Sequence, residues 1–461
     1  MKRYHLIGIG GTGLSAIARI LFEEGYIVTG SDTMLSPFAR ELQALGVKVT
    51  IGHNAKNINS ADFVIRSSAI AEDNVEIIAA RAKGIPVFKR ADFLDELTRG
   101  KIVIAIAGTH GKTTTTSMMA WTLTNIGEQP SYIIGGVSKN LKANAHAGQG
   151  KYFVIEADEY DGMFLGLKPD ILIITNIEHD HPDFYPTPEL YFNAFRELVS
   201  QVKTGGSVLI CIDHPGANRL IQFISPNIHV YTYGTDPQAD FIASEIQQKS
   251  YFTQFSVIQP DVLNTLNVSL KVSGVHNVLN ALSVIAACNL LKLDGKKVQQ
   301  SIEEFIGTSR RFEIIGVANG VTIIDDYGHH PTEIMATLAS ARLRFPGQKL
   351  WVVWQPHTYS RTQTLLNDFI AAFKDCDHVI LTEIYRSREK AREFSSAEVV
   401  RLMEHSDARF IPDFSSIVDD LYQKLKPGDV LIVFSAGDAN QICTQLLARL
   451  QKKEKKGIKN G

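Results

Sequence analysis

Residues 102–118 read IVIAIAGTHGKTTTTSM, in which an apolar strand runs into a glycine turn and a helix-forming segment follows directly. Glycines let backbone N–H groups surround phosphate oxygens, and the helix N-terminus adds positive charge. Lys112 adds a full charge, and Thr113 offers a hydroxyl of the type that binds magnesium. Gly108 and Gly111 stand closer together than in the usual motif, so the sequence predicts a variant nucleoside triphosphate loop. A glycine turn with a surface lysine is the simpler alternative.

The same alternation of apolar strands and helical segments recurs along the chain, which predicts an α/β fold with parallel sheets. At 461 residues the chain is about three times as long as a typical domain. One helix-like segment ends at Gly100 and another ends near Thr308. We therefore expect domains at residues 1–99, 100–309 and 310–461, with a β-rich stretch at 230–270 inside the middle one.

Composition excludes several classes of protein. A formal net charge of -2 gives no overall attraction to nucleic acid or to an anionic membrane. The chain has no apolar run long enough to cross a bilayer, and glycines interrupt the apolar start where a signal peptide would have its core, so a cytoplasmic location is expected. The cysteines lack the close spacing of a zinc site or a disulfide framework and are expected to be free buried thiols: Cys211, Cys288, Cys376 and Cys443.

A second glycine turn lies near the N-terminus. Residues 8–13 read GIGGTG after an apolar strand and before a helix-like segment, and Asp32 follows the next strand. This spacing is typical of dinucleotide-binding folds, yet it reports only that a diphosphate can approach a helix N-terminus. A nucleotide-diphosphate sugar therefore fits as well as NAD, and a tight turn without a ligand is a third alternative.

Acidic residues and histidines follow two strands of the middle segment. VIEADEYD occupies residues 154–161 and TNIEHDH occupies residues 175–181. Because parallel strands deliver their C-terminal ends to one edge of a sheet, these side chains are expected beside the phosphate loop. Carboxylates with an added imidazole suit Mg²⁺, whereas acidic loop tips in water are the alternative.

Four further segments contain polar residues that could bind a ligand together. HNVLN at 276–280 begins a helix, where its asparagines either cap the helix or meet a nucleotide base. The arginine pair at 310–311 is either a solvated pair or a phosphate clamp carried across a domain interface. DDYGHHP at 325–331 and QPHTYSR at 355–361 each follow a strand, and their histidines, tyrosines and arginine suit a small polar substrate better than a core.

Taken together, these segments resemble the Mur ligase family over essentially the whole chain. The shared segments occur in the family's order: GIGGTGLSAIA (8–18), GTHGKTTTTSM (108–118), EADEYDGMF (156–164), TNIEHDHPDFY (175–185), GVHNVLNAL (274–282), RRFE (310–313), DDYGHHPTEI (325–334), QPHTYSRT (355–362) and SAGD (435–438). The resemblance implies a Rossmann-like N-terminal domain for a UDP-sugar, a central P-loop ATPase-type domain with a parallel sheet, and a Rossmann-like C-terminal domain for an amino acid.

The resemblance also implies roles for individual residues. The implied ATP site consists of Gly108, Thr109, His110, Gly111, Lys112, Thr113, Thr114, Asn277, Asn280 and Arg311. The implied Mg²⁺ ligands are Thr113, Glu156 and His181. The implied UDP-sugar site consists of Gly10, Gly11, Thr12, Gly13, Asp32, Ser67 and Ser68. The implied amino-acid pocket consists of Tyr327, His329, His357 and Arg361. The residues expected to act in catalysis are Lys112, His181, Arg311, His329 and Arg361.

One position departs from the family's pattern. The family commonly has arginine after the histidine of QPH, where this sequence has Thr358. Threonine can donate one hydrogen bond but brings no charge, so Arg361 is expected to carry most of the recognition of the amino acid's carboxylate.

The implied activity is the ATP-dependent ligation of L-alanine to the lactyl carboxylate of UDP-N-acetylmuramate through an acyl phosphate, in peptidoglycan precursor synthesis. ATP and Mg²⁺ are the expected cofactors, and a monomer or a weak homodimer without nucleic-acid or membrane partners is the expected state. A recycling ligase that attaches a whole peptide to the same sugar nucleotide is the nearest alternative. An NAD-dependent oxidoreductase leaves the second phosphate loop without a purpose, and a P-loop switch leaves the histidine-rich third segment unexplained.

Overall fold

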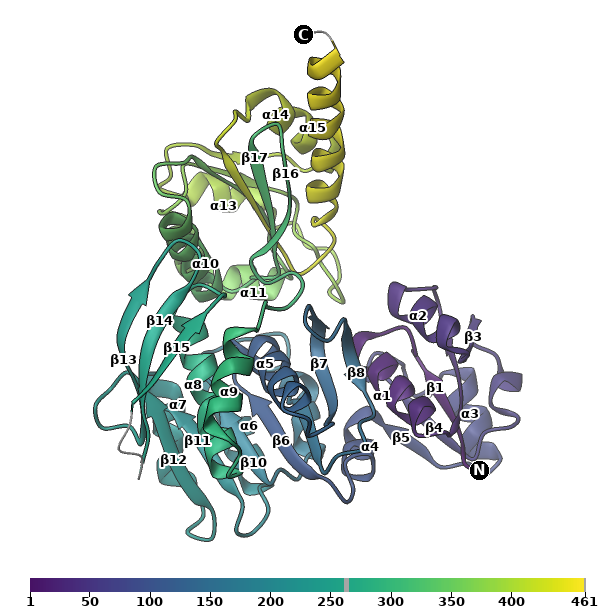
Figure 1. The fold of residues 1–461 in the computed structure, drawn as a ribbon. Helices are drawn as coiled ribbons and strands as arrows, with labels where there is room; N and C mark the ends of the chain where they lie inside the picture. The colour runs from purple at the N-terminus through teal and green to yellow at the C-terminus, as the bar shows by residue number, and fades with distance from the viewer. Residues whose placement is uncertain (261–264, 460–461) are drawn as a thin grey trace.

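The computed structural model describes residues 1–260 and 265–459, which form three β-sheets that follow one another along the chain (Figure 1). Parallel pairs dominate each sheet, and helices join the strands. The predicted α/β class with three sheet-containing domains is therefore confirmed. The predicted boundaries lie in connections between elements, the first after α4 (Arg90–Leu97) and the second between α9 (Gly295–Glu303) and β16 (Glu313–Ala318).

The N-terminal sheet is parallel throughout and has the order β3-β2-β1-β4-β5, which is the order of Rossmann-like sheets. Its strands are β1 (Arg3–Ile7), β2 (Ile27–Asp32), β3 (Lys48–Ile51), β4 (Phe63–Arg66) and β5 (Val87–Lys89). Its helical segments are α1 (Thr12–Glu23), α2 (Pro37–Leu45), η1 (Ala55–Ile58), α3 (Val75–Ala82) and α4.

The central sheet has ten strands in the order β15-β14-β13-β12-β11-β10-β6-β9-β7-β8. The middle strands are parallel and apolar, as expected where helices cover both faces. The predicted β-rich stretch forms one antiparallel end, and the β7–β8 pair forms the other. The strands are β6 (Ile102–Ala107), β7 (Ser131–Ser138), β8 (Ala143–His146), β9 (Tyr152–Glu156), β10 (Ile171–Ile174), β11 (Ser207–Cys211), β12 (His229–Gly234), β13 (Phe241–Gln248), β14 (Thr253–Ile258) and β15 (Leu266–Leu270). The helical segments are α5 (Lys112–Asn125), η2 (Tyr160–Gly166), α6 (Pro188–Ser200), α7 (Pro215–Asn218), η3 (Arg219–Phe223), α8 (Val275–Leu290) and α9.

The C-terminal sheet has the order β16-β17-β21-β18-β19-β20 and is parallel except for β16. Its remaining strands are β17 (Val321–Asp326), β18 (Leu350–Gln355), β19 (His378–Leu381), β20 (Ala408–Phe410) and β21 (Val430–Ser435). Its helices are α10 (Pro331–Arg344), α11 (Tyr359–Thr364), α12 (Leu366–Ala371), α13 (Ser396–Leu402), α14 (Phe414–Lys424) and α15 (Gln441–Lys459), the last of which ends away from the other two sheets (Figure 1).

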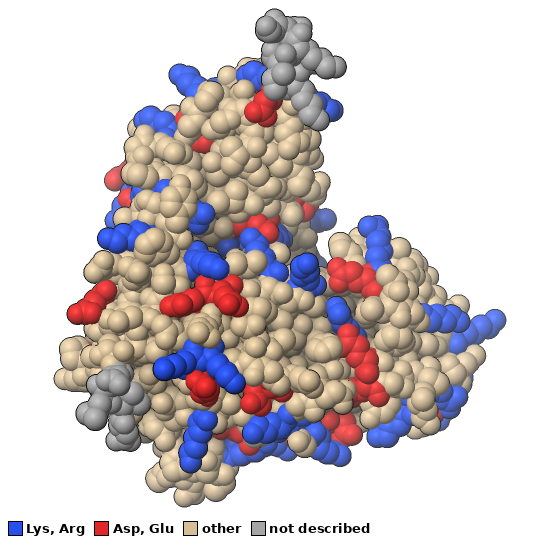
Figure 2. Space-filling model, viewed as in Figure 1, with Lys and Arg blue, Asp and Glu red and all other residues tan. Residues whose placement is uncertain are grey.

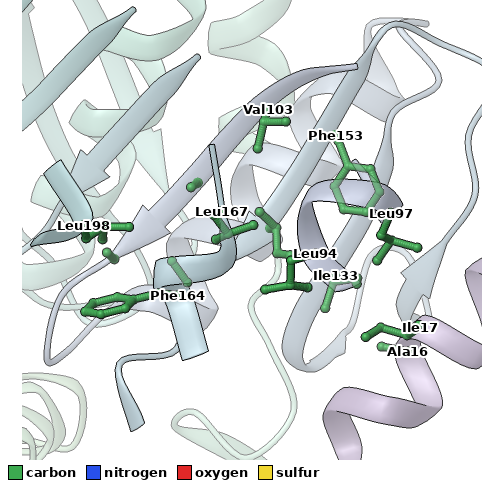
Figure 3. Packing of buried hydrophobic residues seen from close by; sticks show 14 of the residues in the cluster. Ala16, Ile17, Leu94, Leu97, Val103, Ile133, Phe153, Phe164, Leu167 and Leu198 are labelled. Carbon is green, nitrogen blue, oxygen red and sulfur yellow. The ribbon is translucent and has the colours of Figure 1, made fainter. Parts of the chain in front are cut away.

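Helix α4 connects the N-terminal sheet with the central one. Its Leu94 and Leu97 lie among Val103, Ile133 and Phe153 of the central domain in one continuous apolar cluster (Figure 3). Fully burying a leucine side chain contributes about 1.5–3 kcal/mol. This helix therefore holds the end of the N-terminal segment against the central sheet.

The surface in Figure 2 carries basic and acidic side chains interspersed, as the small net charge leads one to expect, and it is notched between the C-terminal and N-terminal parts. In the described ranges, no helix is both long and apolar enough to span a bilayer. All four cysteines are buried and free, which confirms that prediction.

Candidate functional site

The phosphate loop joins β6 to α5, and its glycines adopt backbone angles that other residues avoid. Gly108 has φ 137° and Gly111 has φ 81°, and a methyl group on Gly108 would overlap the Thr175 hydroxyl. The neighbouring strand end holds the loop in place, because His110 N donates to Asn176 Oδ1 at 2.8 Å and Thr175 Oγ1 donates to His110 O at 2.6 Å. The loop is thus tied by hydrogen bonds to the segment that follows β10.

Lys112 lies at the first position of α5, and its side chain is 13% exposed. Its Nζ donates to Gly108 O at 2.6 Å and to Thr109 O at 3.0 Å, and lies 2.9 Å from Glu159 Oε2. Burial lowers the pKa of Lys112, but Glu159 and Glu156 outweigh it and raise the pKa above its ordinary value. The lysine therefore stays charged and is oriented by the loop itself.

Two groups of candidate metal ligands lie beside this lysine. In the first, Thr113 Oγ1 donates to Glu156 Oε1 at 3.0 Å, as expected for two ligands of one cation. In the second, His181 Nε2 lies 3.6 Å from Glu159 Oε1 and 3.7 Å from Asp180 Oδ2. Burial raises the pKa of Glu159 to about 7 although Lys112 opposes the rise. Oxygen donors with one imidazole fit a hard divalent cation.

Glu159 and Asp180 belong to this cluster but are not among the Mg²⁺ ligands expected from the sequence. Both stand in the acidic segments that follow β9 and β10, so the signal was present in the sequence. Four carboxylates in one short loop do not reveal which of them turn toward the phosphate loop. The structure separates them by burial, because Glu159 is almost fully buried whereas Asp161 is exposed.

A cavity of about 560 Å³ opens beside the phosphate loop, between the central and C-terminal domains. The expected ATP-site residues that line it are His110, Gly111, Thr113, Thr114, Asn277, Asn280 and Arg311. Asn280 at the start of α8 packs on the loop, since a methyl group on Gly111 would come within 2.7 Å of its Oδ1. Thr109 faces away, with its hydroxyl 2.8 Å from Glu178 O and 3.0 Å from Tyr191 Oη.

Polar contacts close the C-terminal domain onto the phosphate loop. His110 Nε2 lies 3.0 Å from Glu178 Oε2, and His110 Nδ1 lies 3.4 Å from Glu333 Oε1. Arg311 Nη1 pairs with the same Glu333 oxygen at 3.2 Å, and Thr332 Oγ1 donates to Glu178 at 2.8 Å. Burial lowers the pKa of His110, but its hydrogen bonds to the two glutamates raise it to about 9. The sequence expectations name His110 and Arg311 but miss both glutamates.

The residues expected to form the amino-acid pocket come together at the C-terminal ends of β17 and β18. The ring centroids of Tyr327 and His329 lie 5.5 Å apart, and those of His329 and His357 lie 6.0 Å apart. Arg361 Nη1 lies 2.9 Å from His357 Nδ1. Burial and the neighbouring Arg361 charge lower the pKa of His357 to about 2, so this imidazole stays neutral.

Arg361 also has partners in the central domain that the sequence does not predict. Its Nε donates to Asp180 Oδ1 at 2.7 Å, and its Nη2 lies 3.4 Å from His181 Nδ1. The Arg361 side chain is 2% exposed and that of Asp180 is 4% exposed. Arg361 is therefore a domain-crossing cation as well as a candidate ligand for a carboxylate.

Thr358 lies at the N-terminal end of α11, the helix that contains Arg361. Its φ is 67°, an uncommon value for a residue with a side chain, and it is the N-cap of α11. Its hydroxyl accepts a hydrogen bond from Arg361 N at 3.4 Å, so the threonine caps the helix that carries Arg361.

The N-terminal glycine loop is built around Asp32. Gly10 N donates to Asp32 Oδ2 at 2.8 Å, and Ser36 Oγ donates to Gly10 O at 2.7 Å. Thr12 and Gly13 begin α1, and Ser67 packs against Gly8 at the end of β4. The expected UDP-sugar residues thus gather at the C-terminal edge of the N-terminal sheet, with Ser68 exposed.

Family models match the chain in three consecutive parts: "Mur ligase family, catalytic domain" at residues 3–102, "Mur ligase middle domain" at 106–288 and "Mur ligase, glutamate ligase domain" at 310–437. A UDP-N-acetylmuramate–L-alanine ligase of Geobacter sp. (strain M21) is 41% identical over 455 residues, which cover 98% of each chain. The enzyme of the same name from Sorangium cellulosum is 42% identical over 460 residues, covering 98% of this chain and 97% of its own.

Solved structures of related ligases are also similar to this chain. The crystal structure of a UDP-N-acetylmuramate–alanine ligase from Thermotoga maritima has a TM-score of 0.82 at 29% identity and covers 98% of this chain and 100% of that one. A murein peptide ligase from Psychrobacter arcticus has a TM-score of 0.76 at 26% identity, with 98% and 99% covered. The chain belongs to the Mur ligase family.

Proposed function

We propose that this chain joins L-alanine to the lactyl carboxylate of UDP-N-acetylmuramate and converts ATP to ADP and phosphate, a step in peptidoglycan precursor synthesis. It is an ATP-dependent ligase that acts on small molecules. The observation that carries the proposal is the Arg361–Asp180 pair at 2.7 Å, because it joins the histidine cluster of the C-terminal domain to the acidic edge beside the phosphate loop. An acyl phosphate formed at that edge would lie next to the amine that attacks it.

The first half of the reaction needs charge stabilisation more than covalent chemistry. A carboxylate is a poor electrophile, so its oxygen takes the γ-phosphoryl group of ATP and ADP leaves. Lys112 in the phosphate loop and Arg311, which lines the cavity beside that loop, are placed to offset charge on the transferred group. Thr113 with Glu156, and His181 with Glu159 and Asp180, would hold Mg²⁺, which neutralises phosphate oxygens when bound.

The second half needs an acceptor for a proton, since the amine attacks the acyl carbon and phosphate leaves. His329 Nδ1 lies 3.1 Å from Tyr327 O and its Nε2 lies 3.8 Å from Asp180 Oδ2, so a neutral ring that donates from Nδ1 would offer the Nε2 lone pair to a proton. We assign His329 Nε2 the role of accepting the amine's proton. Closure by the His110, Glu178 and Glu333 contacts would keep water from the acyl phosphate.

The remaining assignments follow from this activity. ATP and UDP-sugars are cytoplasmic metabolites, so we place the protein in the cytoplasm and expect a monomer or a weak homodimer without nucleic-acid or membrane partners. We assign the UDP-sugar to residues 1–99, ATP to residues 100–309 and the amino acid to residues 310–461.

A phosphate-release assay tests the proposal. ATP and UDP-N-acetylmuramate are supplied with L-alanine, L-serine, glycine or the tripeptide of murein recycling, and products are identified by mass. Turnover highest with L-alanine is expected. Turnover with the tripeptide alone would instead assign the chain to the peptide-recycling ligases, which the likeness to a murein peptide ligase keeps as the second candidate.

The metal assignment has its own test. Glu156→Gln removes a charge beside Thr113 but keeps the shape of the side chain, so the Mg²⁺ concentration needed for half-maximal turnover should rise about tenfold. Asp161→Asn is the matched control, because this exposed carboxylate lies in the same segment. An unchanged magnesium titration in Glu156→Gln would remove Glu156 from the metal site.

A further inference from the structure

Arg90, the first residue of α4, reaches the N-terminal glycine loop from a different part of the chain. A methyl group on Gly13 would overlap its Nη1 and Cζ atoms. Gly13 is the last glycine of GIGGTG and lies in the first turn of α1. The missing side chain at this position therefore makes room for a guanidinium group over the helix N-terminus.

The Arg90 guanidinium is unpaired within residues 1–260 and 265–459. It donates no hydrogen bond there and has no carboxylate within ion-pair distance, and its Nε is fully buried. Arg66, at the end of the adjacent strand β4, shows the usual outcome, since its Nη1 donates to Ile70 O at 2.8 Å and its Nη2 pairs with Glu72. Arg90 as a whole is only partly buried, but its buried Nε lacks the partner that buried polar atoms usually have.

The surroundings of Arg90 make its position unfavourable by itself. The N-terminus of a helix carries partial positive charge and repels a cation, and burial lowers the pKa of Arg90. The carboxylates of Asp158 and Glu156 in the central domain oppose that effect by charge at a distance and form no ion pair with Arg90 in residues 1–260 and 265–459. A doubly anionic group beside both the guanidinium and the free N–H groups of the first turn of α1 would satisfy both positive partners at once.

We propose that Arg90 binds the diphosphate of the nucleotide-sugar substrate against the N-terminus of α1. The proposal rests on the proposed function and adds a binding residue outside the glycine motif. Because α4 packs against η2 of the central domain, with Ala91 O in close approach to Gly166, the arginine would clamp the substrate between two domains. The diphosphate would thereby be anchored beside the acidic edge at which the lactyl carboxylate reacts.

Titration calorimetry on the full chain tests this directly, with uridine, UDP, UDP-N-acetylglucosamine and UDP-N-acetylmuramate as ligands. Arg90→Gln should weaken UDP and both UDP-sugars by about tenfold or more and leave uridine unchanged, since only the phosphates meet the guanidinium. Arg90→Lys keeps the charge without the paired donors and should be intermediate. Arg99→Gln is the matched control, because Arg99 follows the same helix and is exposed.

Each other outcome overturns the inference. Equal weakening of uridine and UDP would mean that Arg90 supports the fold of the loop, and thermal melting of both variants would show it. Weakening confined to UDP-N-acetylmuramate would assign Arg90 to the lactyl carboxylate instead. If the wild type ligates L-alanine and the Arg90→Gln variant binds UDP normally, only the inference about Arg90 is contradicted. If the wild type binds no UDP-sugar, the proposed function is contradicted as well.

Discussion

The two glycine loops of this protein have similar sequences, and we assign similar ligands to them, yet they acquire positive charge in different ways. The loop of the central domain carries its own cation, because Lys112 follows Gly111 directly and is held by the carbonyl groups of the loop. The N-terminal loop has no basic residue, and the nearest guanidinium comes from Arg90, far along the chain. A local cation is fixed by the turn itself, whereas a remote one is fixed only when the intervening chain packs correctly.

The largest effect is expected at the local cation. Lys112→Ala should reduce ligation by about 10³-fold or more, because charge on the transferred phosphoryl group loses its nearest partner. Steady-state phosphate release measures the loss. The same variant leaves Glu159 buried without its cation, and protonation of this glutamate, whose pKa burial already raises to about 7, relieves the charge.

A double variant separates the two roles of this lysine. Lys112→Ala with Glu159→Gln should recover the thermal stability of the wild type without recovering turnover, because the second change removes the unpaired carboxylate. Recovery of turnover in the double variant would show that Lys112 serves only to neutralise Glu159, and the local-cation half of the comparison would be wrong.

The same difference between local and remote contacts determines how much of each region the sequence predicts. Strand, glycine turn and helix in register predict the phosphate loop, and the order of the three sheets follows from alternating segments and family motifs. Other contacts of predicted residues join segments more than 60 residues apart: His110 with Glu178 and Glu333, Arg361 with Asp180, and Gly13 with Arg90. No spacing rule reaches that far, so the partners of the predicted residues had to come from the structure.

The next effect concerns a cation that crosses between domains. Arg361→Lys should raise the KM for L-alanine by about 10- to 100-fold and the KM for ATP much less, since lysine cannot bond Asp180 and a carboxylate together. Steady-state kinetics with each substrate varied in turn gives the two values. Asp180→Asn should also raise the KM for L-alanine, because Arg361 loses its partner, and should in addition raise the Mg²⁺ requirement, because Asp180 is a candidate metal ligand. Equal rises for ATP and L-alanine would assign Arg361 to domain closure instead.

A smaller effect compares the glycines of the two loops. Gly13→Ala should displace Arg90 and weaken UDP about tenfold while leaving ATP binding unchanged, because the overlap involves a movable side chain at an ordinary φ. Gly108→Ala should instead impair ATP binding and lower the melting temperature, since φ is 137° and Thr175 is fixed by hydrogen bonds. Titration of both ligands against both variants tests this, and a Gly13→Ala variant that binds UDP normally would contradict the remote-cation half of the comparison.

The smallest effect is expected in the pH dependence of stability at the closure contact. Burial lowers the pKa of His110, but hydrogen bonds to Glu178 and Glu333 raise it to about 9, above the value of about 6.5 for an unfolded chain. A raised pKa means that protonation stabilises the folded state, so the contribution is complete below about pH 6.5 and is lost as the pH rises through about 9. The Glu178 carboxylate stays ionised throughout, because hydrogen bonding to His110 outweighs burial and lowers its pKa to about 2. Between pH 6.5 and 9.5 the wild type should therefore lose about 1–3 kcal/mol relative to His110→Gln in urea titrations, while His229→Gln, at an exposed position, should follow the wild type. Parallel curves for the wild type and His110→Gln would mean that the histidine is neutral in the folded protein and that its two glutamates hold the domains together without it.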